Sequence, residues 1–148
     1  MSRASHGRTP TNHAGCRVRG LAARGPFLGK PSATRGGAAV NPIEAFETLD
    51  LRVGRVLRAE VNTRTRKPAY RLWIDFGPLG EKTSSAQLRA RYTAEELVGR
   101  LVIAAVNLGA RNIAGFTSEV LVLGLPDAEG EVILLATERE VPLGGRVY

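Results

Sequence analysis

The alternation of apolar and polar residues in the middle of the chain predicts β-strands. Tyr70, Leu72, Ile74 and Phe76 occupy every second position, which is the period of a strand with one face in a core. Continuous apolar runs suited to buried strands follow at residues 101–106, 120–123 and 132–135. The pattern therefore predicts a β-rich domain, in which residues 82–88 form a further strand and residues 141–148 close a barrel.

The first strand is expected over residues 51–61, and its pattern is irregular. Leu51 and Val53 are two positions apart, but the next apolar residue is Val56, so the alternation slips at Gly54. An extra residue in one strand bends it, and small barrels use such bulges to close. We therefore expect a bulge at Gly54.

Two short helices interrupt the strands. The segment Asn41-Pro42-Ile43-Glu44 combines a capping amide, a proline in the first turn and an early glutamate, so it predicts a helix that ends near Thr48. Thr93 and Glu96 have the spacing of a capping box, and Gly99 supplies a left-handed exit. This second helix is expected between the third and fourth strands.

The charges divide the chain into two parts. Residues 1–40 carry seven basic groups and no acidic group, and they lack apolar periodicity, so we expect a disordered basic tail. This tail has no apolar stretch of the length that a signal peptide needs. Residues 41–148 contain equal numbers of basic and acidic groups and are expected to form one domain.

The charges of the expected domain are unevenly distributed along the sequence. Residues 51–91 hold ten basic and three acidic groups, whereas residues 112–140 hold one basic and six acidic groups. If the fold keeps them apart, the domain presents a basic face that attracts a polyanion through its local field. If they interleave in three dimensions, the surface is simply solvated.

The composition also excludes several kinds of chemistry. Cys16, His6 and His13 are the only cysteine and histidines, and all lie in the tail. Residues 41–148 therefore hold no Cys/His zinc site, thiol nucleophile or histidine triad. No intrachain disulfide can form, which is typical of a cytoplasmic protein, and no apolar run is long enough to span a membrane. We expect no enzyme activity, cofactor or metal.

The most informative segment is the turn-rich stretch 107–124, Asn-Leu-Gly-Ala-Arg-Asn-Ile-Ala-Gly-Phe-Thr-Ser-Glu-Val-Leu-Val-Leu-Gly, echoed upstream by Leu-Asp-Leu-Arg-Val-Gly-Arg-Val-Leu at 49–57. Together the two segments resemble the tRNA-binding domain family, an oligonucleotide/oligosaccharide-binding (OB) barrel. Residues 70–77, 82–87 and 91–99 are similar to its stand-alone CsaA-type branch, described as an export-related chaperone.

The resemblance covers residues 42–148, and it implies an all-β, five-stranded OB-fold barrel with a short N-terminal helix and a helix between strands three and four. Because it begins only near Pro42, we interpret the tail as the product of a start codon assigned too far upstream rather than as a transit peptide. The expected division is a tail at 1–40 and an RNA-binding domain at 41–148.

RNA is held by cations that follow phosphates, by polar groups that reach sugars and bases, and by apolar platforms. The predicted RNA-binding residues are Arg64, Arg66, Lys67, Lys82, Ser84, Ser85, Gln87, Asn107, Arg111 and Ser118. The resemblance implies contacts from Asn107, Arg111 and Ser118 in particular. The chain departs from the family motif at Asn112, where a lysine is common, and this weakens the phosphate-binding case.

Several residues allow two interpretations. Gly109 and Gly115 mark either tight turns or close approach of a ligand, and Ile113 and Phe116 are either stacking platforms or core. For Glu119 we favour a structural role, in which it fixes the Arg111 loop by charge-assisted hydrogen bonds, over pairing with a ligand hydroxyl.

Trp73 is expected to point outward from its strand, where it forms either an interface anchor or a residue buried under the C-terminal segment. Since the CsaA-type branch forms homodimers, the resemblance implies a symmetric dimer with contacts from Phe46, Trp73 and Tyr148. The predicted function is non-enzymatic, homodimeric binding of tRNA by shape and backbone contacts. The alternative is a peptide-binding export chaperone that uses an apolar groove at the dimer interface.

Overall fold

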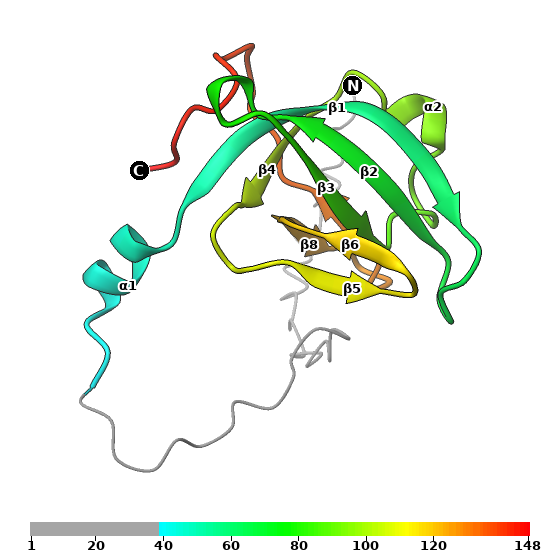
Figure 1. Ribbon diagram of the computed structural model, residues 1–148, viewed down its shortest axis with the longest axis horizontal. Helices are drawn as coiled ribbons and strands as arrows, with labels where there is room; N and C mark the ends of the chain where they lie inside the picture. The colour runs from blue at the N-terminus through cyan, green and yellow to red at the C-terminus, as the bar shows by residue number, and fades with distance from the viewer. Residues whose placement is uncertain (1–38) are drawn as a thin grey trace, which may run out of the picture.

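The computed structural model describes residues 39–148, so the tail predicted at residues 1–40 falls almost wholly outside the described residues. The described chain is mostly β-structure with a few short helices (Figure 1). The elements are α1 (Pro42–Thr48), β1 (Leu51–Asn62), β2 (Ala69–Asp75), η1 (Gly77–Leu79), β3 (Glu81–Ala86), α2 (Ala94–Leu97), β4 (Leu101–Ala105), β5 (Arg111–Ile113), β6 (Phe116–Ser118), β7 (Leu121–Val122), β8 (Gly124–Pro126) and β9 (Val132–Leu134).

Five antiparallel strands form one curled sheet in the order β3-β2-β1-β4-β7. The curl brings the two edges of the sheet together near Thr83 in β3. The carbonyl oxygen of Thr83 accepts hydrogen bonds from the amides of Glu119 (2.8 Å) and Val120 (3.2 Å), just before β7. The predicted OB-type architecture is confirmed, with closure by a few hydrogen bonds instead of a continuous ladder.

β1 is the central strand of the sheet, and each of its halves pairs with a different strand. Leu51 to Arg55 pair with β4, and Arg55 to Asn62 pair with β2. The pairing with β2 shifts register between Val56 and Arg58, so the bulge lies at residue 57. The bulge expected at Gly54 was therefore placed too early in the strand.

Gly54 instead allows the backbone of β1 to pack closely against side chains of and just after β2. A Cβ atom at this position would lie 2.6 Å from Cγ2 of Ile74 and 2.8 Å from Cε1 of Phe76. Both distances are too short for real atoms, so any larger residue would force these core side chains apart. The slip in the apolar pattern thus reflects close packing across the sheet.

The core lies on the concave side of the sheet, and the alternation along β2 correctly predicted its centre. The buried apolar cluster consists of Val56, Tyr70, Leu72, Ile74, Phe76, Leu88, Leu97, Val102, Ala104, Val120 and Leu134. Helix α2 contributes Leu97 and begins with the expected capping box, in which Thr93 and Glu96 bond each other's backbone amides. These hydrogen bonds, first that of the Thr93 amide, lower the pKa of Glu96.

The C-terminal segment extends the sheet beyond the end of β2. The amide of Val53 donates to the carbonyl oxygen of Gly145 (3.0 Å), and the amide of Val147 donates to that of Leu51 (2.9 Å). A single antiparallel bridge joins Arg52 and Arg146. The segment therefore adds to one edge of β1. Residues 141–148 were expected to close the barrel, but the closing hydrogen bonds are those at Thr83. The final residue, Tyr148, is fully exposed.

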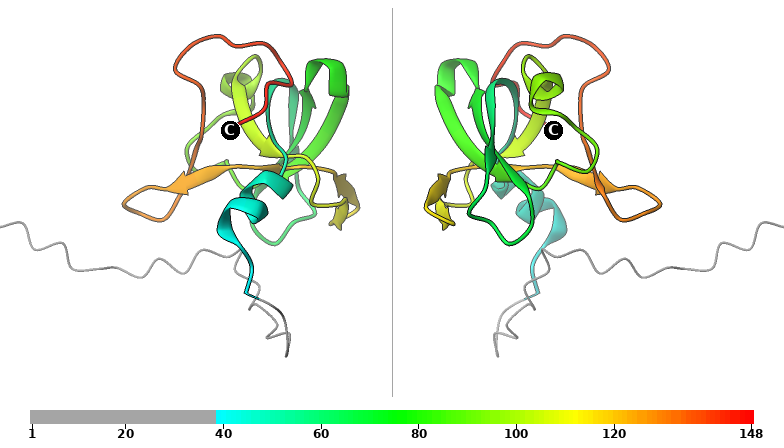
Figure 2. Two further views of the ribbon diagram at one scale, coloured as in Figure 1. Left: turned by 90° about the vertical axis from the view of Figure 1, so that its left-hand side faces the viewer. Right: turned by 90° about the vertical axis from the view of Figure 1, so that its right-hand side faces the viewer.

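Two hairpins project from opposite sides of the sheet (Figure 2). β5 and β6 form one, and β8 and β9 form the other. At the turn of the second hairpin, Arg91 forms ion pairs with Asp127 (2.7 Å) and Glu129. Burial raises the pKa of Asp127, but hydrogen bonds from the Glu131 amide, the Arg91 side chain and the Glu129 amide outweigh it, so that the pKa is lowered.

Candidate nucleic-acid interface

The β5–β6 hairpin is attached to the free edge of β3 by Glu119. Its Oε2 atom accepts hydrogen bonds from the amide (2.9 Å) and the hydroxyl (3.0 Å) of Thr83. The Thr83 hydroxyl also lies 2.7 Å from the carbonyl oxygen of Thr117. Glu119 therefore has the structural role that the sequence favoured, and it supports the hairpin that carries Arg111 by bonding Thr83.

Ser85 and Ser118 provide the next connection between the hairpin and β3. The amide of Ser85 donates to Oγ of Ser118 (3.1 Å), and the Ser118 hydroxyl donates to the carbonyl oxygen of Val120 (3.2 Å). The Ser118 hydroxyl is thus occupied within the chain. We interpret Ser118 as a residue that positions the hairpin instead of one that contacts RNA.

A two-residue turn shapes the tip of the hairpin. Ile113 pairs with Phe116, and the residues between them both have positive φ, 49° at Ala114 and 79° at Gly115. Such values belong to the turn type that matches the twist of a hairpin, and they favour glycine. The amide of Gly115 also donates to Oδ1 of Asn112 (3.0 Å), so this glycine marks a tight turn.

The β1–β2 loop reaches the same hairpin tip through Arg64. A Cβ atom on Gly115 would lie 3.3 Å from Nη1 of Arg64. At the base of the loop, Oδ1 of the buried Asn62 accepts hydrogen bonds from the Arg64 amide and from Nη2 of Arg71, both at 3.2 Å. The loop and the hairpin, which are far apart in sequence, therefore share one edge of the domain.

Arg111 begins β5 directly opposite Ser118. Its side chain is exposed and forms no hydrogen bond or ion pair with any residue from 39 to 148. A guanidinium without an internal partner is available to an anion from outside the chain. Arg64 and Arg111 thus place on neighbouring elements two cationic groups that have no acidic partner among residues 39–148.

A stack of aromatic and cationic side chains covers the convex face beside the hairpin. Phe116 meets Trp73 edge to face, with ring centroids 5.5 Å apart and an interplanar angle of 69°. Cζ of Arg58 lies 4.4 Å from the centroid of Trp73, and Cζ of Arg71 lies 5.5 Å from that of Phe116. All of these distances are within the range of favourable stacking and cation–π contacts.

This stack bears on the alternatives left open for the two aromatic residues. Trp73 is half-buried beneath Arg58 and Phe116 of its own chain, so it does not lie under the C-terminal segment, and its part in an interface stays a prediction. Phe116 is half-buried on the convex face and is not part of the core. Of the two interpretations of Phe116, stacking platform or core, only the stacking platform is therefore compatible with its position.

One of the remaining loop cations, Lys67, lines a separate shallow hollow. Arg66 and Lys67 are exposed, and Lys67 lines an open depression of about 540 Å³ together with Gln87, Arg89 and Val132. Lys67 and Gln87 were both predicted to bind RNA, and the fold places them at one hollow. Arg89 is an additional cation there that was not predicted.

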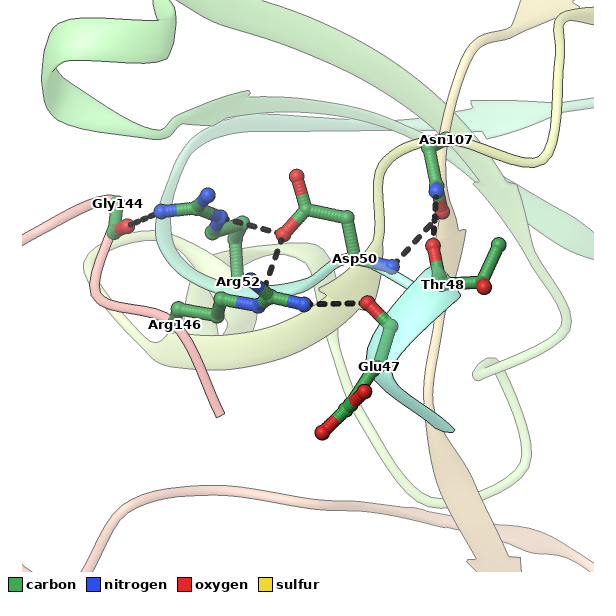
Figure 3. A network of polar contacts seen from close by, with 7 residues as sticks. All are labelled: Glu47, Thr48, Asp50, Arg52, Asn107, Gly144 and Arg146. Atoms are coloured by element: carbon green, nitrogen blue, oxygen red, sulfur yellow. Dashed lines mark hydrogen bonds and ion pairs between the residues drawn. The ribbon is translucent and has the colours of Figure 1, made fainter. Parts of the chain in front are cut away.

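Asn107 connects helix α1 to the sheet (Figure 3). Its Oδ1 accepts a hydrogen bond from the Asp50 amide (2.9 Å), and its Nδ2 donates to the carbonyl oxygen of Thr48 (2.8 Å). Arg52 pairs with the Asp50 carboxylate at 2.6 Å. Because both ends of the amide are engaged at the α1–β1 junction, we interpret Asn107 as a residue that positions α1 instead of one that contacts RNA.

The network in Figure 3 also holds the C-terminal segment. Arg52 donates to the carbonyl oxygen of Gly144 (3.0 Å). Arg146 donates to that of Glu47 (2.6 Å) and approaches Asp50 to 3.9 Å. The first helix and the last residues are therefore tied to the same end of β1.

The comparisons with known proteins agree with this geometry. A family model described as "Putative tRNA binding domain" matches residues 51–146, which is well over half of the chain. The chain belongs to the tRNA-binding domain family.

Proteins of known structure resemble this tRNA-binding domain over their whole length. The crystal structure of chaperone CsaA from Bacillus anthracis is 50% identical with a TM-score of 0.69, and it covers 74% of this chain and 100% of its own. A MetRS-related protein from Pyrococcus horikoshii is 31% identical with a TM-score of 0.66, over 75% of this chain and 100% of its own.

The curated relatives are much longer proteins. The methionine–tRNA ligase of Methanocaldococcus jannaschii is 33% identical over 82% of this chain but only 19% of the ligase. That of Archaeoglobus fulgidus is 38% identical over 71% of the chain and 16% of the ligase. The chain thus spans less than a fifth of these ligases, and the relation concerns this domain alone.

Two of the residues predicted to bind RNA lie on the wrong side of β3. Ser84 and Lys82 pair with Leu72 and Ile74, whose side chains are in the core, so both belong to the concave side of the tRNA-binding domain. Ser84 is only 1% exposed, and its hydroxyl donates to Val120. The expectation for Ser84 is therefore wrong, while Lys82 is half-buried away from the convex face.

Arg58 and Arg71 are the residues of the convex face that the sequence analysis missed. A signal was present, because Arg71 and Trp73 alternate with the core residues of β2. The register places Arg58 opposite Trp73, and that pairing depends on the bulge at residue 57. Without the correct position of the bulge, the partner of Trp73 cannot be derived from the sequence.

A second hollow, of about 390 Å³, brings two of the predicted interface residues together. Phe46 and Tyr148 line it with Glu47, Arg146 and Val147. Helix α1 has no buried residue. Trp73 does not line this hollow, and the contribution of the three residues to one interface stays a prediction.

Within residues 39–148, no cluster of three or more acidic, cysteine or histidine side chains has a metal-binding arrangement. The same part of the chain contains no helix of sufficient length and apolarity to cross a membrane.

Proposed function

We propose that this domain binds tRNA at the edge formed by the β1–β2 loop and the β5–β6 hairpin. The observation that carries the proposal is the position of Arg64 against Gly115, which brings this cation of the β1–β2 loop beside the hairpin that holds Arg111. In OB folds, the loops at these positions flank the ligand surface. Family membership, together with the ligases among the relatives, favours tRNA as the polyanion.

We expect recognition by RNA shape and backbone, without chemical catalysis. The cations at this edge are suited to phosphates, which position an RNA without reading its sequence. The RNA-contact set that we retain is Arg64, Arg66, Lys67, Ser85, Gln87 and Arg111. We expect the protein to act in the cytoplasm, where it would meet tRNA.

Salt dependence of RNA binding tests this proposal. A plot of log affinity against log salt should be linear, with a slope of about −0.7 to −0.9 for each phosphate neutralised. Arg111→Ala should make the slope less steep by about one unit. Arg139→Ala is the matched control, because Arg139 is also exposed but follows β9. An unchanged slope in the Arg111 variant would remove Arg111 from the contact set.

We further propose that a second copy of the chain covers helix α1 and the C-terminal segment. Ile43 and Phe46 are 64% and 46% exposed on a helix that buries none of its residues. Phe46 and Tyr148 line one hollow, so an apolar surface continues across both termini of the domain. Phe46→Asp should raise the dimer dissociation constant in sedimentation equilibrium. A wild-type chain that stays monomeric at high concentration contradicts the dimer.

A peptide-binding chaperone is the second candidate function. The favouring observation is the full-length match to a protein whose title calls it chaperone CsaA. Suppression of client aggregation should then be almost insensitive to salt, survive Arg111→Ala and be lost with Phe46→Asp. If suppression instead falls with Arg111→Ala and with added salt, the effect is electrostatic and the chaperone candidate fails.

A further inference from the structure

We propose that Trp73 and Phe116 form a binding site for one unpaired RNA base, which takes the position of the Arg58 guanidinium over the Trp73 ring. This inference rests on the proposed RNA binding and specifies a contact within it. The family relation implies tRNA binding but does not assign a base-stacking site to these side chains.

The Trp73 ring already accepts a planar group on its face. The guanidinium carbon of Arg58 lies 4.4 Å from the ring centroid, so a flat, delocalised group of similar thickness fits there. Nucleobases stack on aromatic rings in the same manner as guanidinium planes do. The position is therefore shaped for a planar ligand, whichever group occupies it.

Arg58 is held only weakly in this position. Its side chain is 59% exposed, and its ion-pair partner Glu60 is also exposed. Exposed ion pairs contribute little to stability, whereas stacking of a base on an aromatic side chain is worth considerably more. Replacement of Arg58 by a base exchanges an exposed ion pair and a cation–π contact for base stacking, and we expect this exchange to be favourable.

The platform beneath the base is held more firmly. Phe116 supports Trp73 edge to face, and the hairpin that carries Phe116 is fixed to β3 through Glu119 and Thr83. Arg71 covers the Phe116 ring and donates to the buried Asn62. A base entering the site thus meets aromatic surfaces whose positions are already set, which lowers the entropy cost of binding.

The surroundings of the platform suit a nucleotide better than a peptide. Arg64 and Arg111, which have no acidic partner among residues 39–148, lie on the loop and hairpin beside it and match the phosphates on either side of a stacked base.

Tryptophan fluorescence tests this contact directly, because Trp73 is the only tryptophan in the sequence. The full chain is titrated with single-stranded oligouridylate, with duplex RNA and with inorganic polyphosphate. Oligouridylate should quench the emission by stacking, whereas polyphosphate should bind without comparable quenching because it has no bases. Equal quenching by both, or bound oligouridylate with no quenching, overturns the inference.

Substitutions give a second readout. Trp73→Leu and Phe116→Leu keep an apolar side chain but remove the ring, so each should weaken oligouridylate binding about ten-fold. The salt slope and the affinity for duplex RNA should remain unchanged. Leu125→Ala, which alters an exposed apolar residue on the β8–β9 hairpin, is the control and should have no effect on RNA. If a platform variant does not fold, the wild-type quenching result decides.

The two proposals fail in different ways. If the wild-type chain binds no RNA at low salt, the proposed function fails, and the base site fails with it. If RNA binds with the expected salt slope but Trp73→Leu and Phe116→Leu bind oligouridylate as the wild type does, only the base site is overturned. Quenching by unfolded peptide that exceeds quenching by oligouridylate would assign the platform to a polypeptide and also overturn the inference.

Discussion

The carboxylate of Glu119 accepts hydrogen bonds from both the amide and the hydroxyl of Thr83, a residue 36 positions earlier in the chain. This contact fixes the β5–β6 hairpin to the edge of β3. Arg111 and Phe116 lie on that hairpin, so the contact determines where the candidate RNA surface is.

Glu119→Gln should lower the free energy of unfolding by about 1–2 kcal/mol. The substitution keeps the size of the side chain but removes the charge that strengthens both hydrogen bonds. Urea unfolding measures the effect, with Glu138→Gln as the control, because the exposed Glu138 makes no side-chain hydrogen bond within residues 39–148. Equal stability of the two variants would show that the Thr83 contact is unimportant.

Gly115→Ala should reduce both stability and RNA affinity. The positive φ of 79° costs a residue with a side chain about 1 kcal/mol, and the new methyl group would lie 3.3 Å from Arg64. Gly130→Ala is the matched control, because Gly130 has a φ of 86° and nothing lies near its Cβ position. Both variants should lose stability, but only Gly115→Ala should weaken RNA binding. RNA affinities that fall equally would argue against a role for the Arg64–hairpin contact.

Asn107→Ala should affect stability but leave RNA binding unchanged. Both ends of the Asn107 amide bond the α1–β1 junction, so its loss should destabilise the domain by about 1 kcal/mol. Thermal unfolding and a filter-binding titration measure the two effects separately. A fall in RNA affinity with unaltered thermal stability would restore Asn107 to the RNA surface.

Asp127 should stabilise the folded chain at pH values above its ordinary pKa, and this contribution should be lost in acid. Its pKa in the folded chain is lowered from 3.8, so the ionised form is favoured by folding, and the contribution disappears as the pH falls through the depressed value. The stability difference between wild type and Asp127→Asn should be constant near neutral pH and shrink below about pH 4. A difference that grows in acid would contradict the sign of this pKa shift.

Local patterns predicted the elements well because their causes are local. The period-two pattern from Tyr70 to Phe76 marked β2 and its buried face, and Thr93 and Glu96 marked the start of α2. A strand's alternation and a helix cap depend on residues only a few positions apart. The family motif at 107–119 similarly marked the hairpin.

Side-chain roles were harder to predict because they depend on register. Ser84 and Ser85 are adjacent and chemically alike, yet Ser84 is buried against Val120 whereas Ser85 is half-exposed at the hairpin junction. One step along a strand reverses the direction of the side chain. The sequence analysis therefore named both serines and could not separate them.

The amino-acid sequence alone thus determined the β-rich class, both helix caps, the central core strand and the cationic loop of this domain, because each follows from neighbouring residues. The tertiary structure decided that Asn107 bonds the junction of α1 and β1, that Arg64 lies against Gly115 and that Arg58 covers Trp73. These contacts join residues that are distant in sequence or placed by the bulge at residue 57. Folding of the curled sheet is what brings them within reach of one another.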